Sequence, residues 1–503
     1  MTHIQVIDLP CGYGKSSRML ASFKPEKKYI VALPYLSEVD RFVEGAREKS
    51  GVFLTAPKVT DGNKRSHAEK LIREGKSVAM THQLYYKMGT LASPLYDVCE
   101  VVDWQPGGTP VTKTTSLLQD YTVIIDEAIT PFECFGAVTP ADFERDYVEN
   151  GMADVDEEGR VVPTEKWDRR YKEGSKTFLP QVYERAKAGA LYRVERNLYV
   201  TTVPSELLTR VKEVQIYTYL AEGSVLFKHL ENLVAANPGT LTMDVERLAS
   251  ATEAEWRRDV ASALTIKSVP DLEKHSWNHS GQLRSMRSGA DQAKQVGYAL
   301  RKLKRADLSQ VDMRSVMLTC ARDLWCAHRP DQKPKAGILP REARMFGHPV
   351  KRTVCSPALR NDREEWTTTG VQFVPNTTRG TNAHIACDHA IYLYDQNPNP
   401  QIFKFLGIDP GGVEARRFAD HYALTELVQW LFRSAIRVGG INGTDRPYQP
   451  RKPVTVYMPS ERMRNLLTNW LETGNVSSLG PDGTRPSKPA KSRKAGPKRR
   501  SAA

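Results

Sequence analysis

One stretch near the start of the chain, PCGYGKS at residues 10–16, has the residue types and the spacing of a phosphate-binding loop. An apolar stretch precedes it and a stretch with helical spacing follows, which predicts a strand, a loop and a helix. Glycines let such a loop curl so that backbone N–H groups and the helix N-terminus point at phosphate oxygens. The predicted nucleotide contacts are Gly12, Tyr13, Gly14, Lys15, Ser16 and Ser17.

Two side chains of this loop would do distinct chemistry. Lys15 would neutralise the β and γ phosphates of a nucleotide, and the Ser16 hydroxyl would ligate magnesium. The long form of the motif, GxxxxGK[ST], has a glycine where Leu9 stands, so the chain matches only the shorter GxGK[ST] form. The alternative is a bare glycine-rich turn, which the flanking strand and helix disfavour.

A pair of acidic residues, Asp126 and Glu127, directly follows the apolar stretch YTVII. A carboxylate at the carboxyl end of a strand stands where an open α/β sheet binds its ligand. We expect Asp126 to hold magnesium and Glu127 to orient and deprotonate the attacking water, as phosphoryl transfer to water requires. Without further motifs, an Asp-Glu pair after a strand most often belongs to an ordinary loop. Downstream of a phosphate-binding loop it favours nucleotide hydrolysis.

Short apolar strands that alternate with helices are expected to position these residues. The alternation is typical of parallel sheets of the doubly wound type, so the fold class is predicted to be α/β with two lobes. The predicted strands lie at 4–9, 28–33, 76–80, 121–125 and 213–220 in the first lobe, and at 315–319, 390–394 and 454–457 in the second. Residues 1–259 are assigned to the first lobe and 260–473 to the second.

Two segments depart from this alternation. Residues 131–211 are charged and mostly helical in pattern, which predicts a helical insertion in the first lobe. Residues 474–503 are rich in Gly, Pro, Ser and basic residues and have almost nothing apolar to bury, so a disordered basic tail is predicted. Such a tail either keeps the chain soluble or tethers it to nucleic acid.

Taken together, GYGKS at 12–16 and DEAI at 126–129 resemble motifs I and II of superfamily 2 (DEAD/DEAH-like) helicases. That resemblance implies two RecA-like lobes that clamp ATP between them. The stretches 81–83 (THQ) and 379–382 (RGTN) resemble motifs of the same family that accompany nucleic-acid binding, the latter being motif V. The nucleic-acid contacts implied are Thr81, His82, Arg379, Gly380, Thr381 and Asn382.

The stretch QWLFRSAIR, residues 429–437, resembles motif VI of these helicases. Residues 424–436 are apolar at helical spacing, and Arg433 and Arg437 are four apart, so both are predicted to project from one helix face. Such arginines can reach across a cleft and stabilise charge on the γ-phosphate; the alternative is a solvated basic face. The family usually spaces its two arginines three apart, so which of Arg433 and Arg437 is the arginine finger stays open. With Glu127, the predicted catalytic residues are Gln429, Arg433 and Arg437.

The resemblance runs in motif order from about residue 4 to residue 471 and includes two further stretches. TYL at 218–220 stands where these helicases keep a coupling motif, although Tyr219 and Leu220 depart from it. VYMPSERMR at 456–464 is similar to a group of phage-encoded helicase-like ATPases. For Arg462 and Arg464, an exposed first helical turn is as good an interpretation as a functional contact.

Composition limits the classes of partner. A net charge of +13 indicates a polyanionic partner, for which nucleic acid is the commonest choice. No apolar stretch is long enough to span a membrane, and the 7 cysteines form no CxxC pair, which indicates reduced thiols and a cytoplasmic protein. The Cys-Asp-His run at 387–389 has no second cluster of ligands, so structural roles are favoured there.

These expectations favour an ATP-dependent helicase or translocase that uses ATP and Mg²⁺ and acts on DNA with a single-stranded tract, in phage replication, recombination or repair. One alternative is another P-loop ATPase, such as a DNA-packaging motor or a small-molecule kinase. A packaging motor should carry an acidic nuclease-like cluster in its second half, and none is visible. The other alternative is a nucleic-acid-binding protein with a vestigial ATPase, which intact Lys15, Asp126 and Glu127 disfavour.

Overall fold

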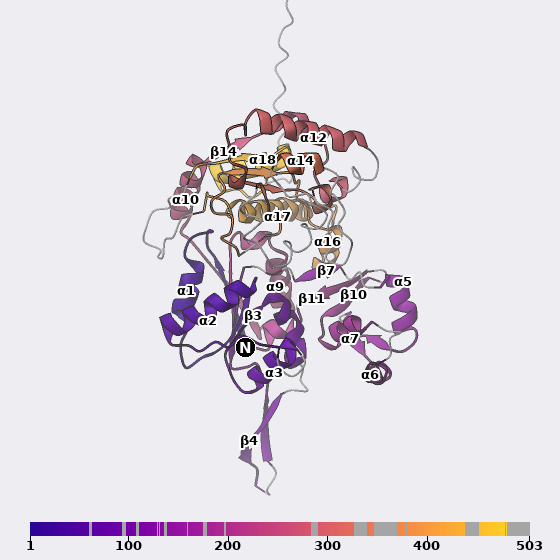
Figure 1. Ribbon diagram of the computed structural model, residues 1–503. Helices are drawn as coiled ribbons and strands as arrows, with labels where there is room; N and C mark the ends of the chain where they lie inside the picture. Colours follow the sequence, from indigo (N-terminus) through magenta and orange to yellow (C-terminus); the bar gives the residue numbers. More distant parts are fainter. Residues whose placement is uncertain are drawn as a thin grey trace, which may run out of the picture.

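The computed structural model has two lobes, one above the other in Figure 1, with a smaller subdomain beside the lower lobe. It describes residues 1–59, 63–92, 97–106, 110–127, 129, 131–134, 138–157, 159–174, 179–195, 198–282, 290–325, 340–346, 370–378, 380–437, 452–477 and 479. Most of the predicted tail at 474–503 therefore lies outside the described residues. Within the described part of the chain, no helix has the length and the apolar character needed to cross a bilayer.

The first lobe is built on a six-stranded sheet in which all neighbouring strands are parallel. In spatial order these are β13 (Leu241–Arg247), β1 (Thr2–Asp8), β12 (Glu213–Thr218), β6 (Tyr121–Asp126), β2 (Lys28–Leu33) and β3 (Val78–Thr81). Its helices are α1 (Lys15–Ser22), α2 (Leu36–Ser50), α3 (Lys64–Arg73), α4 (His82–Tyr85), η1 (Tyr86–Ala92), α8 (Glu206–Thr209), η4 (Ala221–Gly223) and α9 (Val225–Ala236).

Both faces of this sheet are buried, which explains why its central strands are apolar at nearly every position. In β6, Val123 and Ile125 enter one hydrophobic cluster while Ile124, between them, enters a second on the opposite face. Alternate residues of a strand point to opposite faces, so a strand covered on both sides reads as a continuous apolar run.

The second lobe repeats this plan on five parallel strands. In spatial order these are β14 (Leu264–Lys267), β18 (Val454–Tyr457), β17 (His389–Tyr392), β15 (Val316–Thr319) and β16 (Gln372–Phe373). Its helices are α10 (Ser250–Ser262), η5 (Pro270–Leu272), α12 (Ala290–Arg305), η6 (Met313–Ser315), α13 (Arg322–Trp325), α14 (Pro340–Met345), α16 (Pro400–Leu406), α17 (Val413–Leu431) and α18 (Glu461–Thr473). The predicted α/β class with two parallel-sheet lobes is confirmed.

The insertion is a mixed subdomain whose described residues form five strands as well as four helical segments, whereas the sequence pattern predicted mostly helices. Three strands form an antiparallel sheet in the order β10-β11-β7, and β8 pairs with β9. Its elements are β7 (Phe132–Cys134), α5 (Pro140–Phe143), η3 (Glu144–Val148), β8 (Ala153–Val155), β9 (Val161–Pro163), α6 (Glu165–Lys172), α7 (Pro180–Lys187), β10 (Leu191–Glu195) and β11 (Leu198–Thr202). An aromatic core around Trp167 holds it together.

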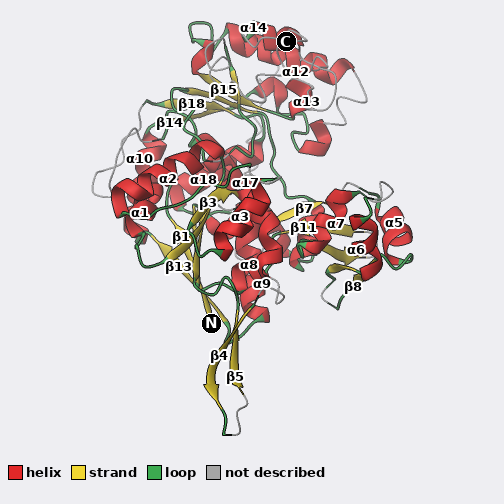
Figure 2. Cartoon of the chain, turned by 60° about the horizontal axis from the view of Figure 1, so that its bottom comes forward, coloured by secondary structure: helices red, strands yellow, loops and turns green. Residues whose placement is uncertain are grey.

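A two-stranded hairpin also projects from the first lobe, away from the second lobe (Figures 1 and 2). It pairs β4 (Val98–Trp104) with β5 (Pro110–Thr115) in antiparallel register. The sequence does not predict this hairpin, because its strands are exposed on both faces and lack the apolar run of a core strand.

The lobes meet along α17 of the second lobe. This helix packs against η4, where Thr425 Oγ1 donates a hydrogen bond to the carbonyl of Leu220 at 3.2 Å. One hydrophobic cluster runs through the interface and includes Cys11, in the loop between β1 and α1, together with Trp430 and Phe432. The loop predicted to bind nucleotide therefore lies against the second lobe.

Candidate nucleotide-binding site

The loop between β1 and α1 has the backbone geometry that its glycines predict. Gly12 and Gly14 have φ values of 85° and 73°, in the left-handed region that favours glycine. Gly14 is the N-cap of α1, and no side chain caps that helix. The N–H groups at the start of this helix are therefore not capped by a side chain, and a helix start of this kind attracts anions.

Lys15 lies folded over this loop and is largely buried. Its Nζ donates to the carbonyl of Leu9 at 2.7 Å and to that of Pro10 at 3.2 Å. These bonds hold the Lys15 ammonium against the backbone of the loop, and an arriving phosphate would compete with the two carbonyls for it. The other predicted contacts, Tyr13, Ser16 and Ser17, are half-buried and open to a ligand.

Asp126 reaches the same edge of the sheet from β6. One strand, β12, separates β6 from β1, and in parallel register Asp8 lies opposite Thr218 while Asp126 lies opposite Tyr217. Burial raises the pKa of Asp126, the adjacent Glu127 raises it further, and Lys15 lowers it. The loop lysine and the predicted magnesium ligand are thus close enough to interact electrostatically.

Glu127 directly follows in an unusual backbone conformation. Its φ is 66°, which is uncommon for a residue with a side chain, and its N–H donates to the Tyr217 carbonyl at 2.8 Å. That turn directs the carboxylate toward the second lobe, where Arg433 Nη2 donates to Glu127 Oε1 at 3.2 Å. The side chains are only 2% and 9% exposed for Arg433 and Glu127, respectively.

The arginines do not share a helix face as predicted, because α17 ends at Leu431 with Phe432 as its C-cap. Arg433 and Arg437 lie in the turns that follow, where the Ala435 N–H donates to the Cys387 carbonyl at 2.7 Å. Both still face the first lobe. Burial lowers the pKa of Arg437, as does Arg433, whereas Cys11, Glu127 and Asp126 act in the opposite direction.

Gln429, the third residue predicted in this stretch, contacts the first lobe through the backbone. Its Nε2 donates to the carbonyl of Tyr219 at 3.1 Å. Its Oε1 is buried and has no hydrogen-bond partner among the described residues. Tyr219, from the stretch compared with the coupling motif, is buried at this interface, and Leu220 beside it has a φ of 54°.

The residues predicted to bind nucleic acid divide between the two lobes. His82 Nε2 lies 3.1 Å from the carbonyl oxygen of Asp126, and Thr81 precedes it at the end of β3. Gly380 packs so tightly on Pro34 that an added Cβ would lie 2.4 Å from Pro34 Cγ. The Thr381 carbonyl accepts a 3.5 Å hydrogen bond from Arg433, and Asn382 is exposed. Arg379 lies outside the described residues.

Three charged residues of the first lobe belong to the site although the sequence patterns did not select them. Buried Asp8 accepts a 3.2 Å hydrogen bond from the Ala221 N–H through Oδ2, while its Oδ1 has no partner among the described residues. Burial raises its pKa. Glu38 and Arg41 both lie in the first half of α2. Glu38 raises the pKa of Asp126, and Arg41 lowers it. An acidic residue at the end of β1, just before the loop, was the available signal.

Other candidates take structural roles. Arg462 pairs with Asp395 at 2.8 Å and with Asp420 at 3.0 Å, so it is neither exposed nor in the nucleotide site. Asp388 Oδ1 pairs with His389 Nδ1 at 2.8 Å, and no group of three metal-ligating side chains occurs in the described part of the chain. Trp430 belongs to the hydrophobic core, and its Nε1 donates to the Val374 carbonyl at 3.0 Å.

The donor set fits a nucleotide with magnesium. Loop N–H groups and Lys15 suit phosphate, and the Ser16 hydroxyl with the Asp126 carboxylate are oxygen ligands of the kind that Mg²⁺ prefers. The Arg433 Nε is buried with no partner among the described residues, so its N–H could donate a hydrogen bond to a phosphate oxygen. Residues from both lobes therefore surround one site.

Comparison with known proteins gives similarity over nearly the whole chain. Residues 265–471 match the YonV C-terminal Rossmann-like domain family. The chain is 22% identical to the SPbeta prophage-derived uncharacterized protein YonV of Bacillus subtilis (strain 168) over 489 residues, covering 94% of this chain and 99% of that protein.

Two solved structures are also similar. S. cerevisiae Dbp5 bound to RNA and ADP BeF3 matches with a TM-score of 0.38 and 11% identity, over 93% of this chain and 83% of that chain. Mycobacterium smegmatis helicase Lhr bound to ssDNA and AMP-PNP matches with a TM-score of 0.35 and 11% identity, over 94% and 46% respectively. The chain is thus similar in sequence to a prophage protein over nearly its whole length, and its second lobe matches a Rossmann-like domain family.

Proposed function

We propose that this protein is an ATP hydrolase whose turnover drives a nucleic-acid helicase or translocase. The observation that carries the proposal is the buried contact between Arg433 of the second lobe and Glu127 of the first, beside Lys15 and Asp126. A site assembled from two lobes couples the chemistry of one to the position of the other. The net charge of +13 supports a nucleic-acid partner, and similarity to a prophage protein supports a phage setting.

The residues divide the reaction among them. Lys15 and the loop N–H groups bind the β and γ phosphates, and Ser16 and Asp126 would hold Mg²⁺, which supplies charge to offset that of the phosphates. Glu127 orients the attacking water and takes its proton. Arg433 and Arg437 stabilise the charge that develops on the γ-phosphate, an effect worth roughly 10³ to 10⁵ in rate for arginines in such positions.

Motion would follow from the same contacts. The γ-phosphate attracts the two arginines, and its loss removes that attraction, so the lobes can separate after hydrolysis. Two hydrogen bonds join α17 to the strand end beside the phosphate-binding loop. They run from Gln429 to the Tyr219 carbonyl and from Thr425 to the Leu220 carbonyl. We propose that Thr81, His82, Gly380, Thr381 and Asn382 contact nucleic acid near this interface, as does Arg379, so that lobe movement shifts the chain along one strand.

The decisive experiment measures ATP turnover by the full chain alone and with single-stranded DNA, duplex DNA or RNA. Stimulation by at least one of them, with single-stranded DNA expected to be the strongest, supports the proposal. Equal turnover in all four conditions contradicts it, since a helicase or translocase must couple hydrolysis to its track.

Two substitutions test the chemical roles within that assay. Lys15→Ala should abolish nucleotide binding or turnover, whereas Glu127→Gln should retain ATP binding and lose most hydrolysis, because it keeps the shape but not the base. Lys49→Ala, which removes an exposed lysine from α2, serves as the control and should behave as the wild type. Wild-type turnover by Glu127→Gln with single-stranded DNA present would rule out the role given to Glu127.

A further inference from the structure

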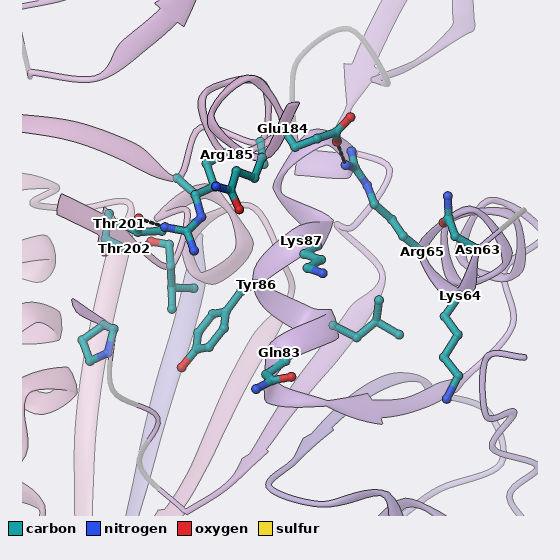
Figure 3. Close-up of a pocket in the computed structure, with 16 residues that line it drawn as sticks. Asn63, Lys64, Arg65, Gln83, Tyr86, Lys87, Glu184, Arg185, Thr201 and Thr202 are labelled. Carbon is teal, nitrogen blue, oxygen red and sulfur yellow. Dashed lines mark hydrogen bonds and ion pairs between the residues drawn. The ribbon is translucent and has the colours of Figure 1, made fainter. Parts of the chain in front are cut away.

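A cavity of about 700 Å³ lies between the first lobe and the insertion (Figure 3). One wall comes from α3, α4 and η1 of the lobe, and the other from α7 and β11 of the insertion. Its volume falls within the range of about 300 to 1,000 Å³ that ligand sites commonly have. The cavity is separate from the nucleotide site, and none of the roles proposed above uses its lining.

The lining is strongly basic. Lys64, Arg65, Lys87 and Arg185 contribute four positive charges, and the described lining contains a single acid, Glu184. That acid is already engaged by Arg65, which also pairs with Glu69 at 2.8 Å. Neither Lys64 nor Lys87 forms an ion pair with any residue that the structure describes. Figure 3 shows Lys87 between the two walls, with Lys64 and Arg185 on opposite sides of it.

Uncharged groups between these cations suit a nucleoside. Tyr86 presents a half-buried ring to the cavity, and the amide of Gln83 is exposed beside it. Arg185 donates to Thr201 Oγ1 at 2.9 Å, which fixes its guanidinium on the insertion side. Aromatic rings stack on bases, and amides and hydroxyls bond to sugars and base edges.

The two walls are held in a fixed relation. Arg65 of the lobe pairs with Glu184 of the insertion. Gly89 in η1 approaches the end of α7 so closely that an added Cβ would lie 2.0 Å from the carbonyl oxygen of Ala188. The cavity is therefore a packed feature of the fold with a defined width.

We infer that the insertion and the first lobe together form a groove for a single strand of nucleic acid. Lys64, Lys87 and Arg185 contact successive phosphates, and Tyr86 stacks on a base between them. The cations are spread over both walls, which suits the spaced phosphates of a strand better than the adjacent phosphates of a mononucleotide. This inference rests on the proposed function and gives the insertion its role in it.

The groove is also connected to the hydrolysis site through one short helix. α4 begins at His82, whose ring contacts the carbonyl of Asp126, and the next residue, Gln83, lines the groove. A nucleic-acid strand that binds in the groove and orders α4 therefore acts directly on the backbone that carries the predicted magnesium ligand and base. Strand binding in the groove should accordingly raise ATP turnover.

The test compares three variants of the full chain, Lys64→Gln/Lys87→Gln, Arg185→Gln, and the control Lys24→Gln/Lys49→Gln, which removes equal charge from exposed positions outside the groove. Binding is measured by fluorescence anisotropy with labelled single-stranded DNA and RNA over a series of salt concentrations. At a loss of about 0.7 in salt slope per phosphate contact, the groove double variant should lose about 1.4 in slope and roughly 25-fold in affinity at about 0.1 M salt. Arg185→Gln should lose about half as much salt slope, about 0.7, and roughly fivefold in affinity.

Several outcomes would overturn the groove. One is a double variant with the wild-type affinity and salt slope, and another is an Arg185→Gln variant that binds as the wild type does, since the insertion would then be no wall of the site. A third is ATP bound by Lys15→Ala protein and lost when Lys64→Gln/Lys87→Gln is added, which would make the cavity a mononucleotide site. In each case the proposed function survives, because wild-type turnover still responds to nucleic acid.

Failure of the proposed function looks different. Wild-type protein that neither binds a strand nor responds to one in the turnover assay would overturn both proposals. Affinity for a fluorescent ATP analogue, measured without nucleic acid, should be the same in all three variants, which checks that the nucleotide site is intact. Cross-linking of a 4-thiothymidine strand to wild-type protein should label the segment 83–87, and labelling confined to the second lobe would also overturn the groove.

Discussion

At the scale of single residues, the most consequential contact is the ion pair between Glu127 and Arg433. Each partner is almost fully buried, and an unpaired charge at such a site costs several kcal/mol, so the pair binds the lobes together as well as positioning the predicted base. The left-handed backbone of Glu127 adds strain of about 1 to 3 kcal/mol that the surrounding contacts must offset. Strain of this kind is concentrated at functional sites.

A double-mutant cycle should reveal that coupling. Glu127→Gln and Arg433→Gln should each destabilise the protein, and the double variant should be more stable than the sum of the two effects predicts, with a coupling on the order of 1 to 3 kcal/mol. Urea unfolding in the absence of nucleotide measures it. The exposed pair Asp142–Arg145 is the control and should be additive. Additive effects at Glu127 and Arg433 would mean that the ion pair does not link the lobes.

At the scale of elements, α17 and η4 form the joint between the lobes. Gly223 of η4 lies so close to α17 that an added Cβ would be 2.2 Å from Thr425 Oγ1 and 2.7 Å from the carbonyl oxygen of His421. Arg433 lies just beyond the end of the same helix. The distance between η4 and α17 therefore fixes how far Arg433 reaches into the first lobe.

Gly223→Ala should push the two elements apart. We expect a loss of about 1 to 3 kcal/mol in the free energy of unfolding, as for other overpacked sites, and a fall in ATP turnover because Arg433 moves with the helix. Gly239→Ala is the matched control: its φ of 81° adds backbone strain, but no atom lies within 4 Å of the added Cβ. The control should lose some stability through this strain and keep the turnover of the wild type. Full turnover in Gly223→Ala would contradict this role for the joint.

At the scale of the whole molecule, two buried histidines make the interface between the lobes sensitive to acid. His229 on α9 packs its ring against Phe405 of the second lobe at 5.3 Å, and His421 lies on α17 beside η4. Burial lowers the pKa of each to about 4. The Nε2 atom of each is buried and has no hydrogen-bond partner among the described residues.

The sign of the pH effect follows from those values. Between the ordinary histidine pKa of about 6.5 and the folded values, the unfolded chain binds more protons, so stability is complete above about pH 6.5 and falls as the pH decreases toward 4. Each of these histidines should lower the free energy of unfolding by about 2 kcal/mol as the pH falls from 7 to 5. Urea unfolding at several pH values measures this loss, and His229→Leu/His421→Leu should reduce it. An unchanged pH dependence in that variant would assign the acid sensitivity elsewhere.

The local elements of this protein could be predicted from its amino-acid sequence. The predicted strands at 28–33 and 454–457 match β2 and β18 residue for residue, because a strand buried on both faces must be apolar throughout. The turn between β1 and α1 was equally predictable, since its glycines stand within one short segment. The exposed hairpin β4–β5 carried no comparable signal and was missed.

How those elements combine became visible in the three-dimensional structure. It brought Arg433 to Glu127 across 306 residues of chain, ended α17 before both arginines, and added Asp8 to the site. It also joined the insertion to the first lobe to form a basic groove whose cations lie far apart in the sequence. Periodicity and motif spacing report on neighbours along the chain, whereas these contacts depend on how the two sheets and the insertion pack against each other.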